Sequence, residues 1–145
     1  MKRFVLDASV TMSWCFEDQQ TGFSEAVLAE IEQGAAPITP PIWLYEVINV
    51  LAAARKKKLI DQATAATFWN KVNKLVTVIE SSGKNAAHEI LELAEKYRLT
   101  AYDAAYLELD MREGLPLATL DKELKKAAQT AGVRMFAPPV NRKNQ

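Results

Sequence analysis

The chain has 145 residues and 49% of them are hydrophobic, which is enough for one domain with a buried core. Its 18 basic residues balance its 18 acidic residues, so no overall charge indicates a nucleic-acid or membrane partner, and any such surface must be local. A single cysteine, Cys15, excludes an internal disulfide, and with a single histidine, His88, there is no Cys/His cluster for structural zinc.

Glycine and proline fall almost entirely between periodic segments, which places the boundaries of the predicted elements. The pattern predicts a strand at 3–6, a short helix from 8, a helix at about 23–33, a strand at 37–39 and helices at 40–58 and 61–74. It continues with a β-branched run at 75–79, helices at 85–97 and 101–113, a strand at 117–120, a helix to about 131 and a strand at 134–136. Strands separated by helices indicate an α/β fold with a parallel sheet of about four to five short strands, flanked by helices on both faces. We expect one domain over 1–136 and a flexible polar tail over 137–145.

Glu46 is the acid that is hardest to explain as a purely structural residue. It lies in the apolar helix predicted from Pro41, and Ile42, Trp43 and Val50 occupy the same face three or four positions away. Its carboxylate is therefore expected to point inward, where a charge is unfavourable unless it is paired, bound to a metal or neutralised by a raised pKa. No basic residue lies at helical spacing, so the partner must come from elsewhere, and a metal ion would serve.

Three aspartates each have a structural explanation as well as a functional one. Asp7 and Asp121 follow predicted strands and fit helix N-caps, while Asp103 fits a capping box with Thr100. Asp7 and Asp121 also lie just past the carboxyl ends of two strands, where open α/β sheets bind ligands. Their shared placement favours a functional interpretation together with Glu46, because clustered carboxylates are ligands for a hard divalent cation.

The four acids stand in segments that resemble the motifs of PIN-domain nucleases, and the spacing is most similar to VapC toxins of toxin–antitoxin pairs. The resemblance covers residues 3 to about 136 and is most specific from Leu99 to Asp121. The segments are Val5-Leu-Asp7-Ala-Ser9, the helix containing Glu46, Leu99-Thr-Ala-Tyr-Asp103-Ala-Ala-Tyr106-Leu and Leu117-Ala-Thr-Leu-Asp121-Lys-Glu-Leu124.

This resemblance implies a metal-dependent endoribonuclease in which Asp7, Glu46, Asp103 and Asp121 hold one or two Mg²⁺ or Mn²⁺ ions. Such ions relieve the repulsion among carboxylates, activate water and neutralise charge on the scissile phosphate. Ser9 and Thr119 match hydroxyl positions that the family keeps near the metal, although a helix-start hydroxyl and a strand residue explain them equally well. The resemblance also implies a homodimer and a cognate VapB-like antitoxin that covers the acidic groove.

A basic run, Arg55-Lys56-Lys57-Lys58, ends the helix that carries Glu46. Such a run is typical of a solvated helix C-terminus, where the macrodipole favours cations. The alternative is that these four side chains bind RNA phosphates. No apolar run approaches the length of a membrane span and no secretory h-region follows the first residues, so we expect no membrane partner and a cytoplasmic location.

Other functions stay open beside the ribonuclease toxin. An aspartyl-phosphate enzyme or receiver domain also places an Asp after its first strand, but the phosphatase pattern needs a second Asp where this chain has Ser9, and a receiver needs paired acids near the start. A PIN nuclease that processes RNA or cuts DNA, and an inactive PIN binding module, are the remaining alternatives. The intact set of acids disfavours the inactive module, and a metal-binding test separates the two.

Overall fold

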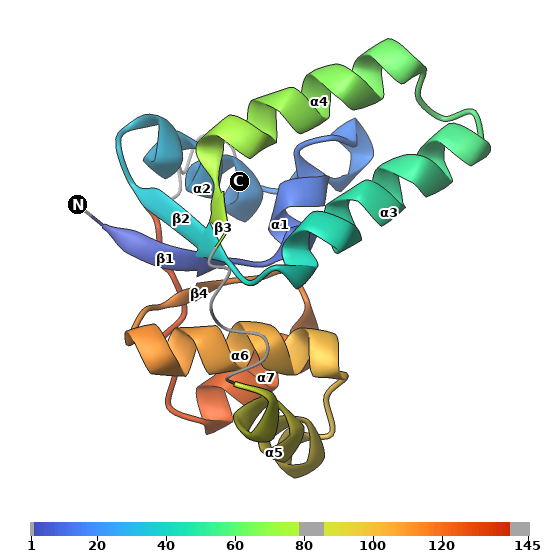
Figure 1. Cartoon of the computed structure of the whole chain (residues 1–145). Helices are drawn as coiled ribbons and strands as arrows, with labels where there is room; N and C mark the ends of the chain where they lie inside the picture. The colour runs from blue at the N-terminus through green and yellow to red at the C-terminus, as the bar shows by residue number, and fades with distance from the viewer. Residues whose placement is uncertain (1, 79–85, 140–145) are drawn as a thin grey trace.

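The chain folds around a four-stranded parallel sheet, seen in a computed structural model that describes residues 2–78 and 86–139 (Figure 1). The strand order is β3-β2-β1-β4, and each adjacent pair runs parallel. The strands are β1 (Arg3–Leu6), β2 (Ala36–Thr39), β3 (Thr77–Val78) and β4 (Leu117–Ala118). The helices are α1 (Ala8–Ser13), α2 (Gly22–Glu32), α3 (Ile42–Lys56), α4 (Gln62–Leu75), α5 (Ala87–Tyr97), α6 (Ala101–Glu113) and α7 (Lys122–Thr130), with a 3-10 turn at Glu17–Gln19.

Helices cover both faces of the sheet, which confirms the predicted α/β architecture. In Figure 1, α5, α6 and α7 lie together on one side of the strands and α1 to α4 on the other, with α3 and α4 extending outward as a helical pair. Strand β1 supplies the centre of the core, because Phe4, Val5 and Leu6 are all fully buried. Parallel strands buried on both faces consist of continuous apolar runs, as this one does.

Several boundaries differ from the predicted ones for local reasons. Helix α3 begins after Pro41, its N-cap, and ends before Lys58, whose φ of 60° is left-handed. Helix α4 continues through Leu75, so β3 contains only two residues of the predicted run at 75–79. Residue 79 of that run, residue 85 of the predicted helix at 85–97 and residues 140–145 of the predicted tail lie outside the described residues.

The C-terminal elements are shorter than predicted because the chain turns towards the acids. Thr119 leaves the ladder after β4, since its hydroxyl accepts a hydrogen bond from the Asp121 amide. With β4 reduced to two residues, the predicted strand at 134–136 has one partner residue and forms a single parallel bridge between Leu117 and Met135. Among the described residues, no helix has both the length and the apolar composition needed to cross a membrane.

The topology brings four distant segments to one edge of the molecule. Strands β1 and β4 are neighbours in register, so the residues that follow them, Asp7 and Thr119, meet at the carboxyl edge of the sheet. Helix α3 starts shortly after β2 at that same edge, and α6 packs against β1. The acids on α3 and α6 are thereby carried to the end of β1.

Candidate active site

Asp7 is a buried carboxylate held by two hydroxyl groups. Its side chain is 4% exposed, and its Oδ2 accepts hydrogen bonds from Ser9 Oγ at 2.6 Å and Thr119 Oγ1 at 2.7 Å. It makes no side-chain cap to α1, so the capping explanation for Asp7 is wrong. Burial raises its pKa most strongly, the two hydroxyls oppose that rise, and the charge of Asp121 adds to it.

The two hydroxyls also fix the turn that carries Asp121. Ser9 Oγ accepts from the Leu120 amide and Thr119 Oγ1 accepts from the Asp121 amide, each at 3.0 Å. Each hydroxyl thus uses its proton on Asp7 and its lone pairs on the backbone between β4 and α7. This network sets the position of Asp121 relative to Asp7.

Glu46 faces the same region from α3. Tyr106 Oη donates a 2.7 Å hydrogen bond to Glu46 Oε1, and Tyr106 Oη also accepts a longer bond of 3.4 Å from the Ala8 amide. The pKa of Glu46 is raised to about 7, chiefly by burial, with Tyr106 lowering it and the charges of Asp7, Asp103 and Asp121 raising it. The inward orientation expected for this residue is therefore accompanied by a raised pKa and a neutral partner.

Asp103 and Asp121 complete the group and differ in their local roles. Asp121 caps α7, because its Oδ1 accepts from the Leu124 amide at 3.0 Å, so the predicted capping is confirmed. In α6 the cap is the hydroxyl of Thr100, which accepts from the amide of Asp103, and the Asp103 carboxylate plays no part in it. The pKa of Asp103 is raised to about 6 by burial first and then by Asp121 and Asp7.

The four predicted acids lie close enough to influence one another, but they do not surround a common point. Each of Asp7, Glu46 and Asp103 has its pKa raised partly by the charge of other members, and Asp121 contributes to all three. Within residues 2–78 and 86–139, no three acid, histidine or cysteine side chains lie close enough to surround a metal ion. The donor set is nonetheless all oxygen and mutually repulsive, which fits a hard divalent cation and no softer metal.

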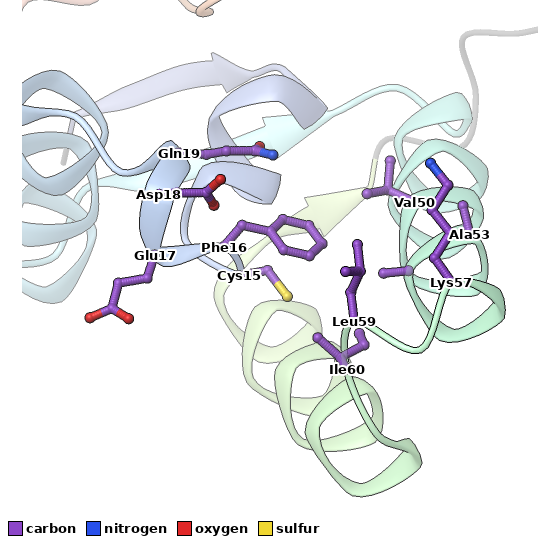
Figure 2. A pocket seen from close by; sticks show the side chains of 11 residues that line it. Cys15, Phe16, Glu17, Asp18, Gln19, Val50, Ala53, Lys57, Leu59 and Ile60 are labelled. Carbon is purple, nitrogen blue, oxygen red and sulfur yellow. The ribbon is translucent and has the colours of Figure 1, made fainter.

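Two adjoining cavities open beside the acids. The first, of about 390 Å³, is lined by Ser9, Glu46 and Leu120 and continues past Gln19 and Val50. The second, of about 770 Å³, shares Gln19 and Val50 with it. Figure 2 shows this second cavity: Phe16, Val50 and Leu59 point inward, Glu17 and Asp18 stand on one side and Lys57 on the other. The lining residues are Cys15, Phe16, Glu17, Asp18, Gln19, Val50, Ala53, Ala54, Lys57, Leu59 and Ile60.

The basic run does not join the acids. Arg55 lies nine residues beyond Glu46 on α3, which corresponds to about 14 Å along the helix axis. Its guanidinium donates a 3.4 Å hydrogen bond to the Ile60 carbonyl, and Lys57 borders the second cavity. Lys56 and Lys58 are exposed. The run therefore belongs to the outer end of the α3–α4 pair and not to the acid cluster.

Three buried polar residues were not identified from the sequence. Tyr106 appeared in the sequence only as a member of the segment that contains Asp103, and the structure shows it fully buried with its hydroxyl on Glu46. Asp110 is 1% exposed, and neither of its carboxylate oxygens has a hydrogen-bond partner among the described residues. The buried Thr39 hydroxyl is likewise unpartnered there. Asp103, Tyr106 and Asp110 are spaced to lie on one helix face, and this spacing is the signal that could have identified Tyr106 and Asp110.

The sequence and the fold match known proteins. The family model for the PIN domain matches residues 4–129. PAE2754 from Pyrobaculum aerophilum shares 25% sequence identity at a TM-score of 0.66, with 87% of this chain and 86% of that chain covered. No curated protein matches the sequence.

Two further solved structures extend the likeness over nearly the whole chain. VapBC2 from Rickettsia felis, bound to a DNA fragment from its promoter, gives a TM-score of 0.67 at 13% identity, covering 94% of this chain and 99% of that one. A toxin–antitoxin complex from Klebsiella pneumoniae gives 0.63 at 17% identity, covering 95% and 99%. At these identities the two likenesses establish the fold.

Proposed function

The chain belongs to the PIN domain family, and we propose that it is a metal-dependent endoribonuclease toxin that a cognate antitoxin neutralises. Members of this family generally depend on a divalent metal ion. The observation that carries the proposal is the convergence of Asp7, Glu46, Asp103 and Asp121 from four segments on one edge of the sheet, where the charges of neighbouring acids help to raise the pKa of Asp7, Glu46 and Asp103.

The four carboxylates are the residues that would hold Mg²⁺ or Mn²⁺. When bound there, such an ion would supply charge neutralisation at a phosphate and activation of water. The chain's own residues prepare the site: Ser9 and Thr119 keep Asp7 in a fixed orientation, and the Asp121 side chain is held at the start of α7. No side-chain nucleophile is required for hydrolysis of this kind.

The antitoxin proposal rests on the surface beside the acids. The cavities run from Glu46 and Ser9 along α3 to an apolar floor at Phe16, Val50 and Leu59. A protein segment with apolar side chains fits that floor, and a basic side chain at its end would pair with the acids and compete with a metal. The Klebsiella pneumoniae structure is a toxin–antitoxin complex, which favours a partner of this kind.

The proposed homodimer has a candidate surface on α3. Tyr45 is 66% exposed and Ile48 is 42% exposed, and both lie on the face of the helix that turns away from the core. Sedimentation of the protein and of a Tyr45→Ser, Ile48→Ser variant tests this contact. We expect the variant to sediment as a monomer, and an unchanged dimer would place the contact elsewhere.

The experiment that tests the activity is cleavage of a mixed structured-RNA pool by purified protein with Mg²⁺ or Mn²⁺. Asp7→Asn and EDTA are each expected to lower the rate by roughly 100-fold or more, because the substitution removes a charged metal ligand and EDTA removes the metal ion itself. Asp61→Asn is the matched control, since Asp61 is an exposed cap of α4. The same assay on duplex DNA and on flap DNA distinguishes RNA cleavage from DNA cleavage. Absence of cutting with every metal and substrate would contradict the proposal.

A further inference from the structure

Tyr106 lies on one acid-bearing segment, and its hydroxyl makes hydrogen bonds to two others. It lies on α6 one turn after Asp103, donates to Glu46 on α3 and accepts from the amide of Ala8, the residue after Asp7. The bond to Glu46 is 2.7 Å, whereas the bond from Ala8 is 3.4 Å and therefore weak. The side chain is 0% exposed, so packing restricts the ring to this placement.

The acids need such a restraint. The charges of Asp7, Asp103 and Asp121 all act on Glu46, and like charges drive its flexible side chain away from the group. The Glu46 side chain has three rotatable torsions, and Tyr106 is the only hydrogen-bond partner of its carboxylate among the described residues. Asp7 has two hydroxyl donors and Asp121 has a backbone amide donor, so Glu46 depends on Tyr106 as those acids depend on their own partners.

We propose that Tyr106 is the positioning residue for Glu46: its buried hydroxyl holds the Glu46 carboxylate against the repulsion of the other acids and so presents it as a ligand. The role goes beyond the proposed function in assigning a residue that is not one of the acids. The test by metal affinity rests on the proposed function, whereas the test by the position of the Glu46 carboxylate does not. Partners that orient a metal ligand typically change metal affinity by about 10–100-fold when they are lost.

The first test is a crystal structure of the metal-free Tyr106→Phe protein beside that of the wild type. Phenylalanine retains the buried ring and removes the hydroxyl, and thermal melting verifies folding before any other measurement. We expect the Glu46 carboxylate to move away from Asp7 and Asp103 or to occupy several rotamers. A carboxylate that stays in place would overturn the proposal, whatever the protein cleaves.

The second test measures Mn²⁺ affinity by calorimetry in a double-mutant cycle. Tyr106→Phe is expected to weaken Mn²⁺ binding by about tenfold, while Tyr102→Phe, which changes an exposed ring, leaves it unchanged. In a Glu46→Ala background, Tyr106→Phe should have no further effect, because the side chain that it positions is gone. An equal loss in both backgrounds would make Tyr106 a general packing residue and overturn the proposal. A wild-type protein that binds no Mn²⁺ would contradict the metal-dependent function, and the crystal structure would then decide the positioning role alone.

Discussion

Helix α6 carries an aspartate in each of two contrasting regions. Asp103, in the first turn, is partly exposed at the edge of the sheet among other acids, whereas Asp110, two turns later, is 1% exposed and unpartnered among the described residues. Burial is the largest cause of a raised pKa at both, giving about 6 for Asp103 and about 9 for Asp110. The larger shift thus belongs to the residue that has less access to solvent and to ligands.

The comparison teaches that a shifted pKa alone does not identify a functional acid. Burial of a carboxyl without a partner destabilises the fold and raises the pKa wherever it occurs. The charge of Asp7 acts on both residues, so what distinguishes Asp103 is that the charge of Asp121 acts on it as well. A cavity also opens beside Glu46, another acid of the group. We therefore assign Asp103 to the candidate site and regard Asp110 as a buried acid that weakens the fold.

The strongest way to break this comparison is to make the same substitution at both positions. Asp103→Asn is expected to lower RNA cleavage by roughly 100- to 1,000-fold, because it removes a charged oxygen ligand while the helix keeps its Thr100 cap. Asp110→Asn should leave the cleavage rate within about twofold, since its buried carboxyl does not line the cavity beside Glu46. Single-turnover kinetics with saturating Mn²⁺ measure both.

The folding of the two variants supplies the control. Asp103→Asn should be as stable as the wild type or slightly more stable, because it removes one repelling charge. If Asp103→Asn instead unfolds, Asp103 is structural. If Asp110→Asn loses activity while remaining folded, Asp110 belongs to the site and the contrast between the two regions fails.

The next largest effect is the dependence of stability on pH. The pKa of Asp110 is about 9 in the folded protein and 3.8 in the unfolded reference, so the folded state binds more protons between these values. Stability contributed by this proton is present below pH 4, falls as pH rises and is fully lost above pH 9. At 1.36 kcal/mol per pH unit, the loss by pH 7 is on the order of 4 kcal/mol.

Urea unfolding at pH 5, 7 and 9 checks this expectation. Asp110→Asn should flatten the decline in the free energy of unfolding over this range, because the amide does not titrate. Asp61→Asn is the control, since the pKa of this exposed cap is lowered and it titrates below the range. An Asp110→Asn protein with the same pH slope as the wild type would show that other groups cause the decline.

The fold followed from hydrophobic periodicity because its signals are local. Apolar runs such as the one at Phe4 and the spacing of glycines and prolines define each element without knowledge of distant residues. Prediction failed where long-range hydrogen bonds oppose the local hydrophobic pattern. The strand predicted to reach residue 120 ends before Thr119, because the Thr119 hydroxyl donates to Asp7 and accepts from the Asp121 amide. The bridge at Met135 is a consequence of that early end of β4.

For the candidate site, the sequence predicted which acids meet but not what holds them. Asp7 and Asp121 follow from strand ends and Glu46 from a helix face, which are properties of single elements, whereas Asp103 was included through the resemblance to PIN-domain motifs. The hydrogen bond from Tyr106 to Glu46 joins two helices 60 residues apart, so no local pattern encodes it. Asp110 illustrates the reverse limit, because an acid that is buried and has no partner in the described part of the chain contradicts the usual preference for exposure.

A smaller effect is expected from the hydroxyls that bind Asp7, since Asp110 has no such partner among the described residues. Thr119→Val removes a donor to Asp7 and the acceptor of the Asp121 amide while conserving side-chain volume. We expect about a tenfold fall in cleavage and a loss of about 1 kcal/mol in the free energy of unfolding. Thr39→Val is the matched control, because this buried hydroxyl has no partner among the described residues.

Activity and urea unfolding of these two variants measure the difference. Thr39→Val should keep full activity and match or exceed the stability of the wild type, since an unpaired buried hydroxyl is replaced by a methyl group. Equal behaviour of the two variants would mean that the hydroxyl network on Asp7 has no special role.

The smallest expected effect concerns the outer end of α3, far from both aspartates. If Lys56 and Lys58 contact RNA phosphates, replacing both by glutamine should weaken RNA binding a few-fold at low salt and reduce the salt slope by about 1 per lost contact. The rate with bound RNA should not change, because the lysines lie about 14 Å or more along the helix from Glu46. Binding titrations between low and high salt measure the slope, with the exposed Lys96→Gln on α5 as the control. An unchanged slope would make the basic run a solvated helix end, and RNA selection would then depend on the surface around the acids.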